Sequence, residues 1–394
     1  MGTMRPATDV QCKILRLLRD EGPASRAALV GLVGVGRARL GVELEELLAS
    51  GLIEESGLSV SRGGRPSPQV SLNSGLRFLA VDLGATSISI AIGDSRLNLL
   101  TFLEEPCDIR SGPDVVLPKV YELVAKAQST VACDTISGIG IGVPGPVSFR
   151  EGIPVSPPLM PGWNRYPLRD EFSRRFRCSV TVDNDVNMMA QGERWGGVAK
   201  GMDDFLFVKI GTGVGSAAVI HGDVYRGAAG CAGDIGHIRA GEGHVCACGN
   251  TGCLETMFSG AALGRDAMAA ATSGESPALA ARLAHSQTLT AIDVGEAAQE
   301  GDAVALSLIK TGGQRLGTVL AELVNFMNPS LVVIAGGISR LGHPLLAEIR
   351  QTVYRQSMPL ATSNLPIVLS ELGETGGVLG GLVTASDWMF SPSA

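Results

Sequence analysis

Three cysteines and a histidine stand close together in the second half of the chain, and their side chains are metal ligands. Cys246, Cys248 and Cys253 follow the spacing C-x-C-x4-C, and His237 stands nine residues before the first of them. Thiolates and one imidazole suit a tetrahedral zinc ion, and four protein ligands make a closed structural site rather than an open catalytic one. Two alternatives stay open: the cysteines could be buried thiols without a metal, and His244 could replace His237 as the fourth ligand.

Two acidic side chains, Asp234 and Glu255, flank this loop, which suggests that the metal shapes a small-molecule pocket. The stretch resembles the zinc-binding signature of the ROK family of repressors, open reading frames and sugar kinases, which reads G-E-x-G-H and then C-x-C-G-x-x-G-C-L-E. Asp234 replaces the usual glutamate, and the segment between histidine and cysteine is slightly short. The resemblance covers roughly residues 78–394 and is carried by Gly233, Gly236, His237, Cys246, Cys248, Gly249, Gly252, Cys253, Leu254 and Glu255.

A strand-turn-strand pattern with a polar, glycine-containing turn occurs twice. Such turns can present backbone amides and a hydroxyl to a phosphate, although either one alone would also fit an ordinary hairpin. Two of them predict a duplicated fold, and the resemblance implies the actin-like, hexokinase-like architecture, with Gly336 and Gly337 as the adenosine-side turn. The residues of the two phosphate turns are Asp82, Gly84 and Thr86 in the first and Gly211, Thr212 and Gly213 in the second.

The first turn departs from the family pattern D-L-G-G-T-K at two positions. Ala85 stands at the second glycine, where its methyl group narrows the approach to a phosphate and makes a positive φ costlier. Ser87 stands at the lysine, so a positive charge is lost. We therefore expect that ATP is not used and that the protein is not an enzyme. The alternative is an ATP-dependent sugar kinase of the glucokinase type with a DNA-binding extension.

Asn184 and Asp185 end a predicted strand and open a helix. In ROK kinases this pair holds the sugar, and its aspartate is the general base for the attacking hydroxyl, so Asp185 would be catalytic if the protein were a kinase. The plainer reading of the pair is a helix N-cap. His237 would place one ring nitrogen on zinc and the other toward a sugar hydroxyl. The resemblance thus implies a sugar site made of Asn184, Asp185, Asp234, His237 and Glu255.

The first fifty residues show helical spacing of apolar side chains in three segments. Thr8 and Ser25 are placed to cap the first two helices, and glycines separate the second from the third. Three helices joined in this way predict a helix-turn-helix, in which Arg37 and Arg39 open the helix that meets base edges. Glu43 is expected to place a negative charge on that helix where phosphates would lie.

A strand-turn-strand pattern follows, with Arg62, Gly64 and Arg65 in its turn. Arginines flanked by glycine and proline form a thin cationic wing that suits a minor groove. Residues 1–76 carry nine Lys and Arg against eight Asp and Glu, a net charge of +1, whereas the remainder carries −8. The alternative is a helical protein-interaction module followed by a linker.

The predicted fold class is α/β, with a winged helix-turn-helix over residues 1–76 and a two-lobed ROK domain over 77–394. The small lobe spans about 77–195 plus a C-terminal helix, and the large lobe spans about 196–370. The five remaining cysteines are scattered singly, and no signal peptide or membrane-length apolar run is present, so we expect a cytoplasmic protein. Trp163 would either stack on a sugar or fill the core.

The predicted function is that of a ROK-type transcriptional regulator whose operator affinity is modulated by a sugar or sugar phosphate. Its partners would be operator DNA, the sugar effector and further copies of the chain in a homodimer or homotetramer. Its cofactor would be structural zinc. A pure protein-interaction adaptor, which would bind neither operator nor sugar, is the third hypothesis.

Overall fold

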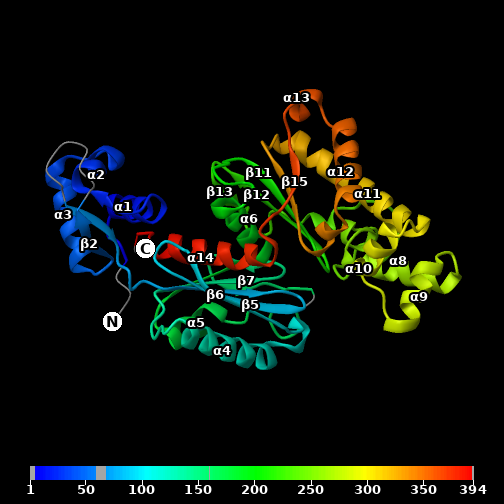
Figure 1. The fold of residues 1–394 in the computed structure, drawn as a ribbon, viewed down its shortest axis with the longest axis horizontal. Coiled ribbons are helices and arrows are strands. Elements are labelled where there is room, and N and C mark those ends of the chain that lie inside the picture. Colours follow the sequence, from blue (N-terminus) through cyan, green and yellow to red (C-terminus); the bar gives the residue numbers. More distant parts are fainter. Residues whose placement is uncertain (1–4, 59–67, 159, 393–394) are drawn as a thin grey trace. The chain divides into compact units, whose positions relative to one another are not determined.

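The computed structural model describes residues 5–58, 68–158 and 160–392, and the chain forms two compact units (Figure 1). Unit 1 comprises Met1–Gly192 and Gly377–Ala394, and unit 2 comprises Glu193–Gly376. The chain therefore leaves unit 1 once, completes unit 2, and returns to finish unit 1 with its last helix. Among the residues that the structure describes, no helix combines the length and the apolar character needed to cross a bilayer.

Unit 1 begins with three short helices and a small antiparallel sheet. The helices are α1 (Asp9–Asp20), α2 (Arg26–Val33) and α3 (Arg37–Ala49). The strands β1 (Ala24–Ser25), β2 (Ile53–Leu58) and β3 (Pro68–Leu72) lie in the order β1-β3-β2. As predicted, the hydroxyls of Thr8 and Ser25 cap α1 and α2 by accepting N–H bonds from Gln11 and Ala28. The helices share a core of Ile14, Leu15, Leu18, Leu29, Leu40, Leu44 and Leu47.

The expectation for Glu43 is wrong. Its side chain is buried, at 6% exposure, because it faces α1 rather than solvent. Its Oε2 atom accepts a hydrogen bond of 2.8 Å from the Thr8 hydroxyl, and its Oε1 atom lies 3.6 Å from Nε of Arg39. The carboxylate therefore ties α3 to the start of α1 instead of opposing a phosphate.

The larger part of unit 1 is a five-stranded mixed sheet in the order β10-β7-β4-β5-β6. Its strands are β4 (Phe78–Leu83), β5 (Ser87–Gly93), β6 (Leu99–Pro106), β7 (Gly138–Val143) and β10 (Ser179–Asn184). Helices α4 (Pro113–Thr130) and α5 (Leu168–Phe176) cover one face, and α14 (Gly376–Met389) lies on the other (Figure 1). A short hairpin, β8 (Val147–Ser148) with β9 (Ile153–Pro154), follows β7.

Trp163 belongs to the core under α4 and α5. It has no exposed surface, and its indole N–H donates a 3.1 Å hydrogen bond to the carbonyl of Ile109. Of the two roles considered for this residue, the structure therefore supports core packing rather than stacking on a sugar.

Unit 2 contains a second five-stranded sheet, in the order β13-β12-β11-β14-β15. Its strands are β11 (Phe205–Ile210), β12 (Val214–Ile220), β13 (Asp223–Tyr225), β14 (Val332–Ala335) and β15 (Ile367–Leu369). Its helices are α7 (Leu254–Met257), α8 (Gly260–Ser273), α9 (Pro277–Ser286), α10 (Ala291–Gln299), α11 (Ala303–Met327), α12 (His343–Gln356) and α13 (Pro359–Thr362). Helix α6 (Asp185–Gly196) begins in unit 1 and ends in unit 2.

The two sheets follow one plan. In unit 1, β4 pairs antiparallel with β5 and parallel with β7. In unit 2, β11 pairs antiparallel with β12 and parallel with β14 in the same way. Each predicted phosphate turn connects the antiparallel pair of its own sheet. The strand pairing thus agrees with the duplication inferred from the two turns.

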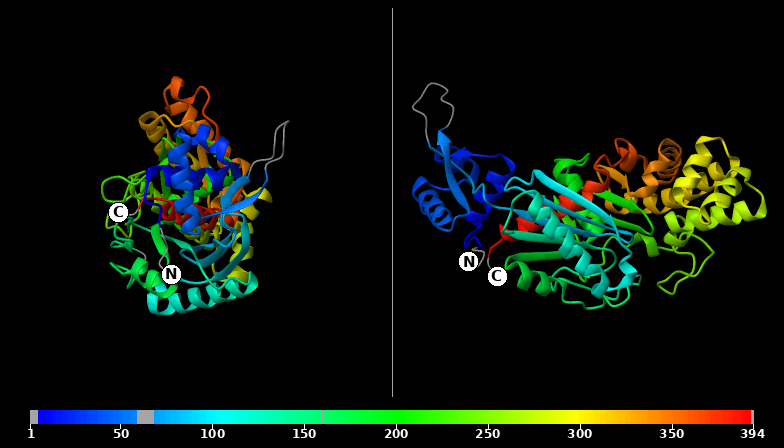
Figure 2. Two further views of the ribbon diagram at one scale, coloured as in Figure 1. Left: turned by 90° about the vertical axis from the view of Figure 1, so that its left-hand side faces the viewer. Right: turned by 60° about the horizontal axis from the view of Figure 1, so that its bottom comes forward.

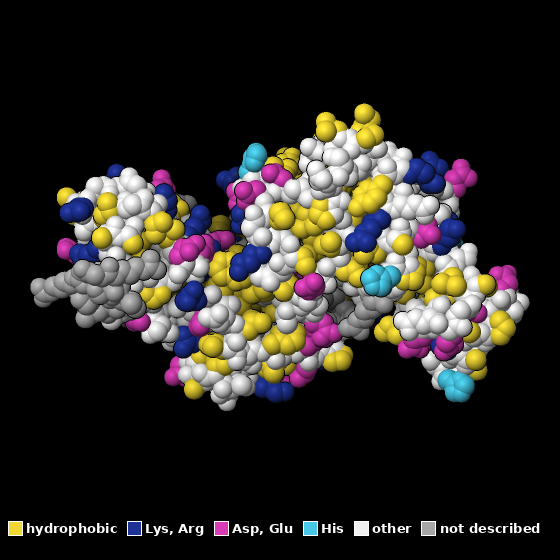
Figure 3. Space-filling model, turned by 45° about the horizontal axis from the view of Figure 1, so that its top comes forward, with side chains coloured by type: hydrophobic (Ala, Val, Ile, Leu, Met, Phe, Trp, Pro, Cys, Tyr) yellow, Lys and Arg dark blue, Asp and Glu magenta, His cyan; other side chains and the backbone are white. Residues whose placement is uncertain are grey.

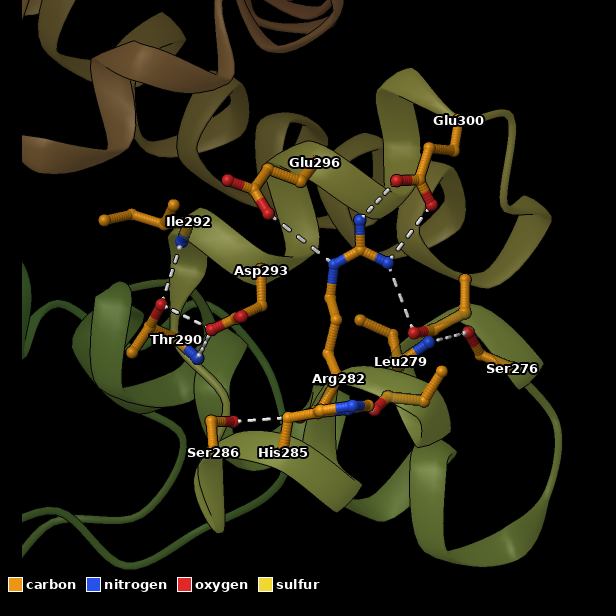
Figure 4. Close-up of polar contacts among 12 residues, drawn as sticks. Ser276, Leu279, Arg282, His285, Ser286, Thr290, Ile292, Asp293, Glu296 and Glu300 are labelled. Atoms are coloured by element: carbon orange, nitrogen blue, oxygen red, sulfur yellow. Dashed lines mark hydrogen bonds and ion pairs between the residues drawn. The ribbon is translucent and has the colours of Figure 1, made fainter.

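Caps and ion pairs hold the short helices α9 and α10 of unit 2 (Figure 4). The Arg282 guanidinium on α9 lies 2.6 Å from Oε1 of Glu300 and 3.6 Å from Oε2 of Glu296. Thr290 and Asp293 form a capping box at the start of α10. The ion pairs therefore join α9 to α10.

Candidate functional site

The four predicted metal ligands lie together in a loop of unit 2. The turn η2 (Ile235–His237) carries the histidine, and two isolated backbone bridges, between residues 239 and 253 and between 245 and 251, close the loop that carries the cysteines. Gly252 has φ +76°, and a side chain there would overlap the carbonyl of Gly241. Glycine is therefore required for the loop to bring Cys253 back beside His237.

The donor atoms are close enough together to hold a metal ion. All four ligand atoms of His237, Cys246, Cys248 and Cys253 lie within 4.8 Å of one another. Cys246 Sγ is 3.4 Å from Nδ1 of His237, and Cys248 Sγ is 3.6 Å from Sγ of Cys253. Bond lengths of about 2.0–2.3 Å to a tetrahedral zinc place neighbouring donors roughly 3.5–3.8 Å apart, close to these separations. His244, the competing ligand, is not part of the cluster.

The loop also fixes the direction of the His237 ring. Its Nδ1 atom faces the cysteines, so Nε2 points away from them, 3.9 Å from Oδ1 of Asp234. This distance is too long for a direct hydrogen bond, although a ligand hydroxyl or a water could bridge the two groups. A metal on Nδ1 would hold the ring in this orientation and leave Nε2 as a hydrogen-bonding group.

Glu255 connects the predicted metal loop to the second of the two predicted phosphate turns. It is the second residue of α7, and its Oε2 atom accepts a 3.2 Å hydrogen bond from the N–H of Val214. A side chain at Gly213 would overlap this carboxylate oxygen. The missing Cβ at residue 213 therefore lets the carboxylate reach the backbone of the turn.

Two further glycines, Gly260 and Gly336, contact the turn between β11 and β12. The N–H of Gly260, at the start of α8, donates a 2.7 Å hydrogen bond to the carbonyl of Gly211. Gly336 has φ +89°, and a side chain there would overlap the carbonyl of Ile210 at the end of β11. The predicted residues Gly211, Thr212, Gly213, Gly336 and Gly337 thus lie together with Glu255 at one edge of the unit 2 sheet.

In unit 1 the predicted residues gather at the carboxyl ends of parallel strands. Asp82 on β4 and Asp183 on β10 both stand opposite Gly142 of β7 in the sheet register. Asn184 and Asp185 follow directly, at the junction of β10 and α6. In α/β sheets this edge is where ligands bind. The buried Asp185 carboxylate also stands in the first turn of α6, where the helix dipole favours a negative charge.

Asn184 is the N-cap of α6, as the plainer reading proposed. Its Oδ1 atom accepts hydrogen bonds from the N–H groups of Val186 and Asn187, at 2.9 and 3.3 Å. Its Nδ2 atom donates to the carbonyl of Gly145 at 3.0 Å. These bonds fix the start of α6, and with it the Asp185 carboxylate, so capping and a role in ligand binding are compatible.

Asp183 and Asn187 were missed by the sequence reasoning. Each is only 2% exposed, and the Asn187 amide donates a 2.9 Å hydrogen bond to Asp183 Oδ1. The same oxygen accepts a hydrogen bond from the N–H of Asn184. The signal was available, because Asp183 and Asn187 flank Asn184 and Asp185 and stand four residues apart across the start of a helix.

The first phosphate turn is closed by backbone bonds. The Gly84 N–H donates to the carbonyl of Ser87 at 2.8 Å, and a Cβ at Gly84 would come within 3.1 Å of that carbonyl. Ala85 is not among the described residues with positive φ. The higher cost of a positive φ therefore does not apply at Ala85, and its added methyl group and the missing lysine separate this turn from the family pattern.

Of the predicted DNA-binding residues, the structure describes two. Arg37 and Arg39 are exposed in the first turn of α3, and Arg39 pairs with Glu43. Arg62, Gly64 and Arg65 lie outside the described residues, between β2 and β3. The described part of the chain therefore leaves the wing prediction untested.

A second carboxylate that the sequence did not single out is buried where α6 enters unit 2. Glu193 is 1% exposed and accepts hydrogen bonds from the Ser370 hydroxyl and, at 3.0 Å, from the N–H of Val198. Burial raises the pKa of Glu193 above its ordinary value of 4.5. This residue packs the end of α6 against the loop that leads back to unit 1.

Two α/β units on one plan, each with a polar hairpin turn and one with a Cys3His loop, define a sugar-kinase-like protein. The chain belongs to the ROK family, whose profile matches residues 78–387. The glucokinase of Halalkalibacterium halodurans is 33% identical over 308 residues, which cover 77% of this chain and 93% of the enzyme. The xylose repressor of Caldicellulosiruptor bescii is 30% identical over 373 residues, which cover 93% of this chain and 92% of the repressor.

Similar solved structures likewise include both a transcriptional regulator and a glucokinase. A ROK family transcriptional regulator, described as a homologue of the Escherichia coli MLC protein, has a TM-score of 0.83 at 28% identity and covers 96% of each chain. A ROK glucokinase from Streptomyces griseus, in complex with glucose and AMPPNP, has a TM-score of 0.70 at 28% identity. It covers 78% of this chain and 99% of its own. The two regulators thus match nearly the whole chain, and the two kinases match about three quarters of it.

Proposed function

We propose that the protein is a DNA-binding transcriptional regulator whose operator affinity changes when a sugar or sugar phosphate binds. The observation that carries this proposal is the extent of the matches. The xylose repressor and the regulator structure cover 93% and 96% of the chain, which must include most of the N-terminal helices, whereas both glucokinases leave out about a fifth. The additional segment is the one with a DNA-binding pattern.

The N-terminal helices and sheet are, in this proposal, a winged helix-turn-helix. Helix α3 would enter the major groove with Arg37 and Arg39 at its start, while Arg62, Gly64 and Arg65 between β2 and β3 would reach the minor groove. On the face drawn in Figure 3, basic and acidic side chains are interspersed, and the chain carries a net charge of −7. Attraction to DNA would therefore depend on these local arginines rather than on a broad basic surface. A homodimer or homotetramer would read a symmetric operator.

The sugar would be recognised by Asn184, Asp185, Asp234, His237 and Glu255. Carboxylates accept hydrogen bonds from sugar hydroxyls, whereas the Nε2–H of His237, with a metal on Nδ1, would donate a hydrogen bond to a sugar oxygen. The names of the relatives make glucose and xylose the first compounds to test. Which of them binds is set by the geometry of these side chains.

The metal would be zinc with a structural role. Three thiolates and an imidazole favour zinc over magnesium or calcium, and four protein ligands leave no open coordination position. Its contribution would be to hold His237 and the start of α7 in place, and thereby Glu255. We place the protein in the cytoplasm, where thiolate ligands stay reduced and operator DNA is accessible.

A sugar kinase is the second candidate, and the 33% identity to a glucokinase favours it. Asp185 would then accept the proton of the attacking hydroxyl. Loss of the lysine at position 87 opposes this candidate, because phosphoryl transfer depends on stabilisation of phosphate charge. A coupled assay with ATP and the sugar panel separates the two functions. Turnover that disappears in Asp185→Asn would favour the kinase.

The test of the regulator is an anisotropy titration against DNA selected from a random library. We expect binding in the nanomolar range at physiological salt, and saturating sugar is expected to change the affinity at least fivefold. The proposal would be contradicted if no DNA were selected from the library, or if no sugar that binds the protein changed its affinity for DNA.

A further inference from the structure

Helix α14 carries a glycine face at its start that touches the ligand-binding edge of unit 1. A side chain at Gly377 would overlap the Asp82 carboxylate, and one at Gly380 would overlap the carbonyl of Met188 on α6. A side chain at Gly140 of β7 would overlap the carbonyl of Gly381 in the same way. With no side chains between them, the helix backbone lies directly on β7 and α6 and against the Asp82 carboxylate, so a shift of either element must displace α14.

The other end of α14 is bonded to the N-terminal helices, and the two segments lie side by side in every view (Figures 1 and 2). Arg19 of α1 is 5% exposed. Its Nη1 atom donates hydrogen bonds to Oδ1 of Asp387 at 2.8 Å and to the hydroxyl of Ser386 at 3.1 Å, and its Nε atom bonds Asp20 at 2.7 Å. A buried guanidinium is stable only with such partners, so this contact has one specific geometry.

The guanidinium of Arg19 stays positively charged although it is buried. Burial alone would lower the pKa of its guanidinium, but the carboxylates of Asp387 and Asp20 outweigh burial and raise that pKa above its ordinary value. Next to this pair, the Arg5 guanidinium lies 4.8 Å from the centre of the Trp388 ring, a cation–π contact. Two consecutive residues of α14, Asp387 and Trp388, therefore contact basic side chains of the N-terminal region.

Polar contacts continue from α1 to α3. The Gln11 amide of α1 donates a 2.6 Å hydrogen bond to Glu46 of α3. The hydroxyl of Thr8, the N-cap of α1, donates to Glu43 of α3. The described residues thus form an unbroken series of contacts from Asp82 and α6, through α14 and α1, to α3.

We propose that the Arg19–Asp387 ion pair fixes the N-terminal helices to α14, so that displacement of α14 at its glycine face moves α3. This inference rests on the proposed function, because it assigns the route by which the sugar site would regulate DNA binding. Arg19 and Asp387 are positioning residues in this scheme and contact neither ligand. Removal of the ion pair is expected to leave sugar binding and operator binding intact but to remove the effect of one on the other.

Pulsed electron–electron double resonance tests whether the N-terminal helices are fixed to α14, and it needs no sugar or DNA. Spin labels on genetically encoded ketone side chains at Leu32 of α2 and Val115 of α4, which are 50% and 49% exposed, leave the cysteines untouched. The expected result is a narrow distance distribution in the parent protein and a broad one in Arg19→Met and in Asp387→Ala. Asp387→Ala is the second variant because Asp387 is 36% exposed and the buried Arg19 guanidinium keeps Asp20 as a partner in it. A distribution that stays narrow in Asp387→Ala overturns the proposal.

The matched control is Arg110→Met, which removes the same charge from an exposed ion pair elsewhere in unit 1. Arg110 is 71% exposed and lies 2.7 Å from Asp108. This variant is expected to keep the parent distance distribution. Broadening in Arg110→Met as well would show that general destabilisation, and not loss of the Arg19–Asp387 pair, frees the N-terminal helices, which would also overturn the proposal.

The regulatory consequence is tested with calorimetric sugar titrations and operator titrations with and without saturating sugar. Sugar affinity of Asp387→Ala should stay within twofold of the parent. Where the parent shows a fivefold or larger effect of sugar on operator affinity, the variant should show less than twofold. A full sugar effect in a variant with a broad distance distribution would overturn the assigned route. A parent without any sugar effect would refute the proposed function instead, while the distance measurement would still decide whether the pair holds the helices.

Discussion

Substitution of Gly213 by alanine tests the link between the second turn and the proposed sugar site. A Cβ at residue 213 would overlap Oε2 of Glu255, so the carboxylate must leave the N–H of Val214. Gly211, two residues earlier in the same turn, is the matched control. A Cβ there would meet only Cε of Lys209, at 3.8 Å, which is an ordinary contact.

The magnitude follows from the hydrogen bonds that Glu255 makes. A hydrogen bond to a charged group contributes about 1.5–3 kcal/mol, and displacing the carboxylate would remove the bond of this kind that we propose between Glu255 and the sugar. Gly213→Ala is therefore expected to bind sugar about 10- to 150-fold more weakly than the parent, whereas Gly211→Ala should bind within a few fold of it. The overlap is also expected to cost about 1–3 kcal/mol of stability, as overpacked cores do.

Isothermal titration calorimetry with the sugar identified in the panel measures this difference. Metal content, measured by mass spectrometry, should stay at one equivalent in both variants, because neither residue is a ligand. Equal sugar affinities in the two variants, whether both native or both weakened, would refute the assignment of Glu255 and the steric reasoning.

Three further predictions concern the predicted metal loop, the buried carboxylate of Glu193 and helix α3. Removal of the metal with a strong chelator, or by Cys253→Ser, should abolish sugar binding and lower the melting temperature, since the four ligands hold His237 and α7; unchanged sugar binding by metal-free protein would contradict this. Because burial raises the folded-state pKa of Glu193, the native state binds more protons than the unfolded state, so this residue makes stability fall as pH rises from about 4.5 through the raised pKa. Glu193→Gln should flatten that decline in denaturant titrations between pH 5 and 9, and a decline as steep as the parent's would argue against it. Gly41→Ala should stabilise α3 by about 0.5–1 kcal/mol, because a Cβ there meets nothing within 4 Å; faster amide exchange in α3 would contradict the reasoning.

Local signals in the sequence predicted most of the fold. Capping hydroxyls at Thr8 and Ser25 placed the first helices, because the physics of an N-cap involves only a few neighbouring residues. The alternation of apolar residues around the two polar turns likewise placed the hairpins β4–β5 and β11–β12. The C-x-C-x4-C spacing placed the metal loop for the same reason, since its ligands lie within seventeen residues of one another.

Contacts between distant segments were the part that the sequence did not predict. Glu43 looked exposed on its own helix, but its partner Thr8 stands 35 residues earlier. The partner of Arg19 stands 368 residues later. The burial of Trp163 and Glu193 likewise depends on packing against elements distant in the sequence, which no local pattern identifies.

The division of unit 1 along the chain has a consequence for synthesis. The sheet strands β4 and β7 leave the ribosome early, but α14, which covers them through Gly381 and the fully buried Val378 and Leu382, is made only after the whole of unit 2. Domains fold as units once their parts are available. A nascent chain therefore carries its N-terminal helices long before the surface that Arg19 docks on exists. A chain interrupted before α14 would therefore carry the proposed DNA-binding helices without Asp387, the residue that is proposed to fix them.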